Sequence, residues 1–186
     1  MKALLKKLGL VKPDPAAVAL YQAAVQEARR EIHFTDWRVP DTVDGRFDMI
    51  SLMVALVNRR IGLCDPSRVE RIQALAQELF DVMFKDMDIN LRELGVSDEG
   101  MKHRIKPMAS AHLGRVKAYT DVLGIVDESE RRAEMVAALD RNVYRVVEDA
   151  DPAPLAARVL VLAEHLDGIS DDDILAGRFA FLDLKE

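Results

Sequence analysis

The sequence has a single cysteine, Cys64, among its 186 residues. One thiol excludes an internal disulfide framework and a cysteine-rich metal site, and it is weakly typical of a reducing compartment. Aromatic residues make up only 5% of the chain, and runs of β-branched residues are short, which favours helices over strands. Nearly half of the residues are hydrophobic, so the chain has enough apolar surface to form a folded core.

The motifs of the common enzyme classes are also absent from the sequence. It contains no G-x-G-x-x-G, no Walker-type loop, no G-x-S-x-G and no H-E-x-x-H. A di-iron site in a helical bundle needs Glu-x-x-His motifs on two helices, and this chain has none. His112 falls within the apolar stripe of its helix, which indicates a core residue rather than a base. We therefore expect no catalysis, no metal site and no cofactor.

Positive charge is not in excess. The formal net charge is −6, and residues 1–126 hold 19 Lys and Arg against 17 Asp and Glu. The acidic excess therefore lies in residues 127–186. This balance argues against specific DNA binding and against bulk contact with nucleic acid.

Residues 1–13 form a basic amphipathic segment. Its apolar members can share one helical face: Leu4, Leu5, Leu8 and Val11. Lysines flank that face: Lys2, Lys6 and Lys7. The segment is too short and too charged to span a bilayer. Two interpretations stay open, weak contact with an anionic membrane surface and a cationic terminus that aids solubility.

The remaining residues, 14–186, are predicted to form one all-α domain, a bundle of about six to seven helices. Hydrophobic residues cover almost the whole circumference of the helix predicted to begin near Asp41, which indicates a central, buried helix. Asp41 is its expected N-cap, and Asp44 follows in a capping-box-like position. Arg46 and Asp48 are expected in its polar first turn.

Residues 69–94 carry an apolar stripe at helical spacing, typical of a helix packed on a core. Its members are Val69, Ile72, Ala76, Leu79, Phe80, Met83, Phe84, Met87, Leu91 and Leu94. A separate charged face consists of Asp81, Lys85, Asp88 and Arg92. Each acid precedes a base at i,i+4, the order that stabilises a solvated helix. A helix stop is expected at Gly95, and a new cap at Ser97 or Asp98.

The same helix has a second apolar line, away from the main stripe. Leu75, Val82 and Ile89 recur every seven residues. A helix with two apolar lines either packs on two sides or presents one line to a partner. Burial against another helix of this protein is the more common outcome.

The helix predicted over residues 98–123 is basic along its flanks. No acid occurs between Gly100 and Thr120, and the N-terminal half carries Lys102, Arg104 and Lys106. A solvated helix is one interpretation; a surface for rRNA, lipid headgroups or an acidic partner is the other. The lack of interleaved aromatic residues weakens the RNA version.

Helical periodicity alone indicates a helical domain of unspecified role, but three sequence segments are more specific. PDTVDGRFDM (residues 40–49), LFDVMFKDMDINLRELGVSD (79–98) and RNVY (141–144) resemble the ubiquinol–cytochrome c chaperone family. The resemblance covers roughly residues 15–165, and the spacing of the strings is that of an alphaproteobacterial-type member.

This resemblance implies a non-enzymatic, all-α chaperone that binds newly synthesised cytochrome b during biogenesis of ubiquinol–cytochrome c reductase, respiratory complex III. It also implies a cytoplasmic protein, peripheral to the inner membrane, that acts with a small assembly partner or the ribosome. Such a chaperone needs an apolar surface and polar groups to orient its client. The expected client-binding residues are Leu75, Val82, Ile89, Asp81, Lys85, Asp88, Arg92, Asp41, Asp44 and Arg46. Lys2, Lys6, Lys7, Lys102, Arg104 and Lys106 are expected to contact a membrane or ribosome. The alternative is a helical scaffold for self-association without a client.

Overall fold

The computed structural model describes residues 12–183, which are helical and contain no strand. The six long helices are α2 (Pro15–Ala28), α4 (Val43–Gly62), α5 (Val69–Glu93), α6 (Asp98–Leu123), α7 (Glu128–Asn142) and α8 (Ala153–Asp167). Two short helices are α3 (Glu31–Thr35) and α9 (Asp171–Leu175), and a 3-10 turn (Pro66–Arg68) precedes α5. The predicted all-α class is confirmed.

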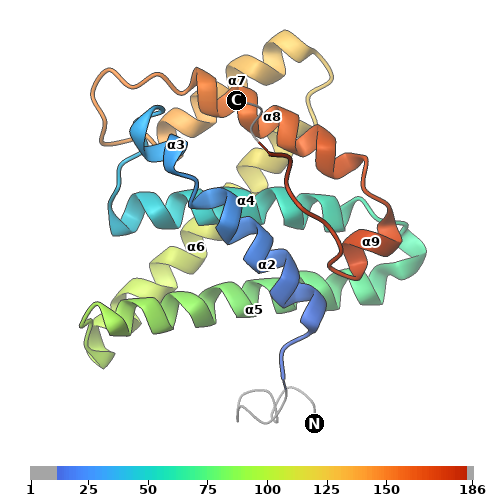
Figure 1. Cartoon of the computed structure of the whole chain (residues 1–186), viewed down its shortest axis with the longest axis horizontal. Helices are drawn as coiled ribbons and strands as arrows, with labels where there is room; N and C mark the ends of the chain where they lie inside the picture. Colours follow the sequence, from blue (N-terminus) through green and yellow to red (C-terminus); the bar gives the residue numbers. More distant parts are fainter. Residues whose placement is uncertain (1–11, 184–186) are drawn as a thin grey trace.

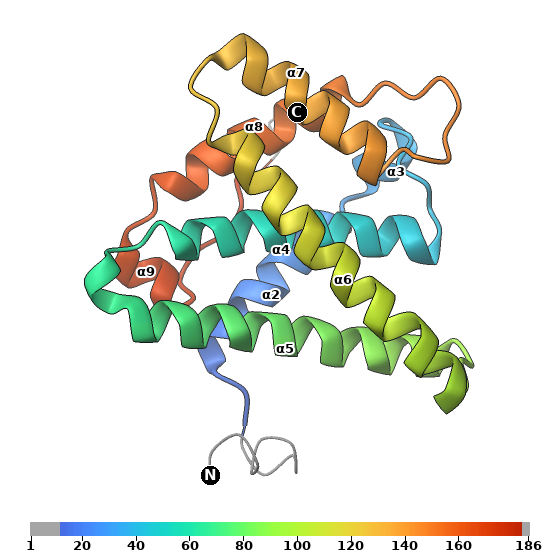
Figure 2. The same cartoon turned by 180° about the vertical axis from the view of Figure 1, so that it is seen from behind.

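Helix α4 is the centre of the fold. It contacts α2, α5, α6, α8 and α9, and its residues from Phe47 to Val57 are all buried. Helix α2 crosses α4 and α5 on one side (Figure 1), and α6 crosses the same two helices on the other side (Figure 2). The all-round hydrophobicity of this segment therefore did indicate its central position, because it meets neighbours in every direction.

Side-chain caps set most helix starts. Asp14 accepts a hydrogen bond from the Ala16 amide at 2.9 Å, with Pro15 as the first helical residue. Ser97 caps α6 and Ser170 caps α9 in the same manner. A side-chain oxygen at these positions satisfies one of the free backbone amides of the first helical turn.

The start of α4 differs from the prediction. Thr42, not Asp41, is the N-cap, and its Oγ1 accepts a hydrogen bond from the Gly45 amide at 3.1 Å. Asp41 lies one residue earlier and accepts a hydrogen bond from Arg46 Nε at 2.6 Å. Both side chains suit a cap, so only the path of the preceding loop decides between them.

Gly45 is required at this helix start by a close backbone approach. A Cβ built on it would lie 2.0 Å from the Pro40 carbonyl oxygen, a clash with backbone that no side-chain rotation relieves. The loop that contains Pro40 can therefore pack on the first turn of α4 only when this position lacks a side chain.

The apolar stripe of α5 is buried along most of its length. Leu79, Met83 and Leu91 are fully or nearly fully buried, whereas Val69 and Leu94 at the two ends are exposed. The prediction was wrong for these two residues, so the buried stripe is shorter than the apolar one. Gly95 ends the segment with a φ of +83°, as expected of a glycine stop.

Buried ion pairs connect the helices across the core. Arg158 of α8 donates from Nε and Nη2 to Glu27 Oε1 of α2, at 3.0 and 2.9 Å. Asp48 of α4 pairs with Arg115 of α6, whose Nη2 lies 2.6 Å from Oδ1, and with Arg145 after α7. Asp48 was expected in a polar first turn, but its side chain is only 2% exposed. The approach of α6 and of the segment after α7 buries it.

The C-terminal segment folds back onto the helices. Phe179 and Phe181 pack against the core, and their rings make an edge-to-face contact. No helix within residues 12–183 is both long enough and apolar enough to cross a membrane.

Candidate functional site

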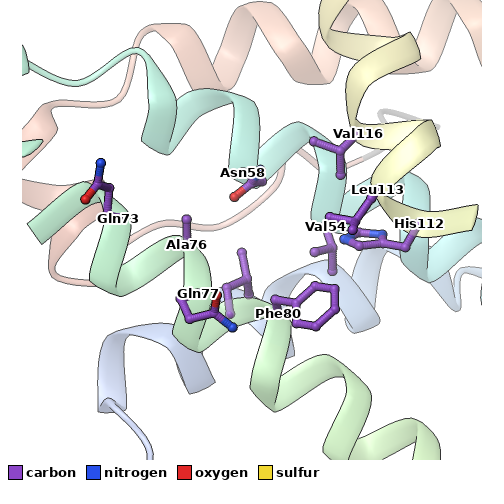
Figure 3. A pocket seen from close by; sticks show the side chains of 10 residues that line it. Val54, Asn58, Gln73, Ala76, Gln77, Phe80, His112, Leu113 and Val116 are labelled. Carbon is purple, nitrogen blue, oxygen red and sulfur yellow. The ribbon is translucent and has the colours of Figure 1, made fainter. Parts of the chain in front are cut away.

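An open groove of about 600 Å³ lies where α4, α5 and α6 cross. Side chains from all three helices surround it (Figure 3). The lining residues are Val54, Asn58, Gln73, Ala76, Gln77, Leu79, Phe80, His112, Leu113 and Val116. The groove exists because α6 crosses α5 obliquely and leaves the N-terminal half of α5 uncovered on this side (Figure 2).

The groove has apolar walls and a rim of amide side chains. Leu113 of α6 is 58% exposed, and Phe80 of α5 is half-buried against the core. Gln73 and Gln77 lie one turn apart along the α5 edge, and Asn58 lies on α4. Apolar walls with neutral hydrogen-bonding groups at the edge suit an apolar helix whose own edge is polar.

His112 closes the groove at its inner wall. Its Nδ1 lies 2.9 Å from the Ser51 hydroxyl, and the rings of Phe80 and Phe84 lie about 6 Å away. Burial, together with the nearby Arg115 charge, lowers the pKa of His112 to about 4, so the side chain is neutral at pH 7. The expectation of a core residue is confirmed.

The predicted second line of α5 is only partly available at the surface. Leu75 is fully buried in the core and is removed from the candidate surface. Val82 is half-buried against the core, and Ile89 is 46% exposed. Helix α2 packs on α5, and the Tyr21 hydroxyl of α2 donates to Asp86 at 2.7 Å. Burial within this protein, the more common outcome, therefore holds for Leu75.

The charged face of α5 does not line the groove. Of its four residues, Asp81 is linked to the rim, because Gln77 Nε2 donates to its Oδ1 at 2.8 Å. Lys85 is exposed. Arg92 bridges Asp88 and Asp98, at 2.8 and 2.5 Å, beyond the groove near the α5–α6 turn. The predicted Asp88–Arg92 pair is thus present at the surface, and client contact by this face stays a prediction.

We expect the double substitution Asp88→Ala with Arg92→Ala to lower the free energy of unfolding by less than about 1 kcal/mol. The reason is that the pair is about half-exposed, so solvent screens its attraction. Urea unfolding followed by circular dichroism measures the change. A loss of several kcal/mol would contradict the surface role and would mean that this face is part of the structural core.

Of the candidates at the start of α4, only Arg46 lies at a second, smaller hollow. Asp41, Asp44 and Arg46 are exposed. Arg46 borders a cavity of about 120 Å³ that is also lined by Leu94 and Met108. This cavity shares no residue with the main groove, and none of the predicted client-binding residues lines that groove.

The predicted membrane or ribosome contacts are described only in part. Arg104 and Lys106 are exposed on α6. The side chain of Lys102 lies outside the described residues, as do Lys2, Lys6 and Lys7.

No group of three or more His, Cys, Asp or Glu residues within the described chain lies close enough to hold a metal ion.

The groove itself was not predicted. Gln73, Gln77 and Ala76 repeat at three- and four-residue steps on α5, a weak signal of an uncharged edge next to the apolar stripe. Leu113 and Val116 come from a helix distant in sequence. They lie opposite Phe80 because of the angle at which α6 crosses α5. The residue pattern along one helix does not predict that angle.

Comparison with known proteins decides the family. The profile described as ubiquinol-cytochrome C chaperone matches residues 35–181. The chain belongs to this family. A crystal structure of the Cbp3 homolog from Brucella abortus is similar to this chaperone-family protein, with a TM-score of 0.77 and 34% sequence identity. The match covers 98% of this chain and 97% of that chain. A comparison with curated proteins found no match.

The strings that carried the family resemblance have identifiable structural roles. In residues 40–49, Gly45 admits the Pro40 carbonyl, and Asp48 forms the buried ion pairs. Tyr144, the last residue of the RNVY string, donates from its hydroxyl to the Trp37 carbonyl at 2.8 Å. These residues join segments that are far apart in the sequence, so they stabilise the shared fold whatever surface a chaperone-family member uses.

Proposed function

We propose that this protein is a non-enzymatic assembly chaperone that binds newly synthesised cytochrome b during biogenesis of ubiquinol–cytochrome c reductase. The observation that carries the proposal is the family match over residues 35–181, supported by the likeness to the Cbp3 homolog. Both support a role in assembly of complex III. Binding of cytochrome b is the step that we add.

The groove at α4, α5 and α6 is the proposed client site. A membrane subunit that has not yet been inserted exposes apolar helices, and these need an apolar surface while they are in water. The walls at Phe80, Leu113 and Val116 offer such a surface, and Gln73 and Gln77 offer hydrogen bonds at its edge. An apolar helix docked there would contact the groove through residues spaced three and four apart.

The other predicted contacts remain part of the proposal. Val82 and Ile89, with Lys85, Asp88 and Arg92, form a second candidate face for the client. Arg104 and Lys106 on α6, with the N-terminal lysines, are proposed to contact an anionic membrane or the ribosome at the cytoplasmic side of the inner membrane. A small assembly partner protein is proposed on the family analogy alone.

Site-specific photo-crosslinking in cells that make cytochrome b tests the proposal. With a photoreactive amino acid at Gln77 or Leu113, we expect a strong adduct to newly made cytochrome b, because both side chains border the open groove. Probes at Asp88 and Ile89 report on the second face, and a probe at the exposed Glu134 of α7 is the matched control.

Adducts from Asp88 and Ile89 alone would keep the chaperone function and move its site to the second face. No adduct to cytochrome b from any of these positions would contradict the proposed function. Adducts between two copies of this chain would instead favour the scaffold alternative.

A further inference from the structure

The smaller hollow beside Arg46 is not used by the proposed function. It lies where the C-terminal ends of α2 and α5 meet the N-terminal half of α4, with α6 behind them (Figure 1). Four buried apolar side chains form its floor: Phe47, Ile50, Met87 and Leu91. At its edge, Val43 and Leu94 are instead 43% and 63% exposed. The hollow therefore offers an apolar surface that water can reach.

The hollow has room for one bulky apolar side chain. Its volume is about 120 Å³, and an apolar cavity of roughly 150 Å³ holds one benzene molecule. Met87 and, from α6, Met108 line it, and methionine side chains adapt to the shape of the group that they contact. A leucine or phenylalanine side chain from another molecule fits this space, whereas a whole helix does not.

Two arginines line the hollow beside the apolar floor. Arg29, at the end of α2, is exposed and forms no ion pair with any residue from 12 to 183. Arg46 donates from Nε to Asp41, and its Cζ lies 5.5 Å from the centre of the Phe34 ring, a contact that orients the guanidinium. The two Nη groups of an arginine can bind a carboxylate, so the hollow can attract two carboxylates at once.

We propose that this hollow binds an acidic segment of another protein, in which one bulky apolar side chain has a carboxylate on each side. The apolar side chain enters the hollow, and Arg29 and Arg46 each pair with one carboxylate. The hollow shares no residue with the client groove, so this site does not depend on the proposed function.

The charges around the hollow favour a peptide over a membrane surface. Asp41 and Asp44 are exposed at the same helix start, so a continuous anionic surface would meet them as well as the arginines. A peptide can place its carboxylates at the arginines alone. Asn90 donates from Nδ2 to the Asp86 carbonyl at 2.7 Å, which leaves its Oδ1 to accept a backbone N–H from the peptide.

Fluorescence anisotropy with a labelled peptide tests the site in the purified full-length protein. The probe has the sequence Gly-Asp-Glu-Phe-Glu-Asp-Gly. One control peptide carries alanine in place of the phenylalanine, and the other carries asparagine and glutamine in place of the acids. The test variant is Arg29→Gln with Arg46→Gln. Its matched control, Arg132→Gln with Arg141→Gln, removes the same charge from two exposed arginines of α7 that do not line the hollow.

We expect the dissociation constant to rise at least about tenfold for each control peptide and for the variant at Arg29 and Arg46. The variant on α7 should change it by less than about twofold, because it alters only the net charge. Leu94→Ser, at the edge of the hollow, should weaken binding several-fold, whereas Leu63→Ser, which replaces another exposed leucine, should not.

Equal losses in the two arginine variants, or equal affinity for the phenylalanine and alanine peptides, would overturn the proposal, because charge alone would then explain binding. A lack of saturable binding below about 1 mM would overturn it as well. Phosphatidylglycerol vesicles that displace the probe, and that themselves need Arg29 and Arg46 to bind, would assign the hollow to a membrane instead. Self-association that is lost in the variant at Arg29 and Arg46 would assign it to a second copy of this chain.

Discussion

Replacing Asp48 with alanine is expected to lower the free energy of unfolding by about 3–5 kcal/mol, the usual cost of removing one partner from a buried ion pair. Arg115 is only 9% exposed and would keep its charge in the core without the carboxylate that lies 2.6 Å away. Arg145 would lose its ion-pair partner as well. Urea unfolding at neutral pH, with circular dichroism as the signal, measures the loss.

Asp41→Ala is the matched control for this prediction. Asp41 also pairs with an arginine at 2.6 Å and lies seven residues earlier, but both side chains are more than half exposed. We expect its loss to cost less than about 1 kcal/mol, because water screens the pair. If Asp48→Ala and Asp41→Ala had equal, small effects, the buried cluster would not stabilise the junction of α4 and α6.

The second large expected effect is a loss of folding stability when the pH is lowered. The pKa of His112 is lowered to about 4, mainly by burial, against an ordinary value of 6.5 in the unfolded chain. Below pH 6.5 the unfolded chain therefore binds a proton that the folded protein does not, and stability falls as the pH drops. By pH 4 this group alone is expected to remove about 3 kcal/mol of the free energy of unfolding.

The matched variant is His112→Asn, whose amide nitrogen can hydrogen-bond to Ser51 in place of Nδ1 and does not titrate. Unfolding free energies measured between pH 7 and pH 4 should fall more steeply for the natural protein than for the variant. Burial also lowers the pKa of His33, so both proteins should show some loss, and the difference between them isolates His112. Identical slopes would contradict a neutral, buried His112.

These two predictions concern the walls of the proposed client groove. His112 lines the groove directly, and Asp48 holds α6 to α4 through Arg115, three residues beyond His112. The position of α6 determines how wide the groove opens. Variants that loosen this junction are therefore expected to lose stability and client contact together, whereas Asp88 and Arg92 can be changed with little effect on the fold.

The family resemblance and the candidate site overlap only in part, since Leu79 and Phe80 of the 79–98 string also line the groove. Gly45, Asp48 and Tyr144 belong to the strings that identify the family, and each makes a contact across the fold. Gln73, Gln77 and Leu113, which border the groove, lie outside those strings. Similarity in the strings thus reports a common architecture, and the identity of the client-binding surface needs the crosslinking experiment.

The sequence by itself determined the local structure of this protein. Caps at Asp14, Ser97 and Ser170 and the stop at Gly95 were predictable because they depend on hydrogen bonds and backbone angles within a few residues. The central place of α4 was predictable for a related reason, since a helix that is apolar on all sides has to be enclosed.

Only the tertiary structure decided which apolar and charged groups remain at the surface. Leu75, Val82 and Ile89 share one line on α5, yet Leu75 is fully buried and Ile89 is 46% exposed. Asp48 and Asp41 look alike in sequence, and the approach of α6 buries one of them. Burial depends on where distant helices cross, and periodicity along one helix carries no information about a crossing angle.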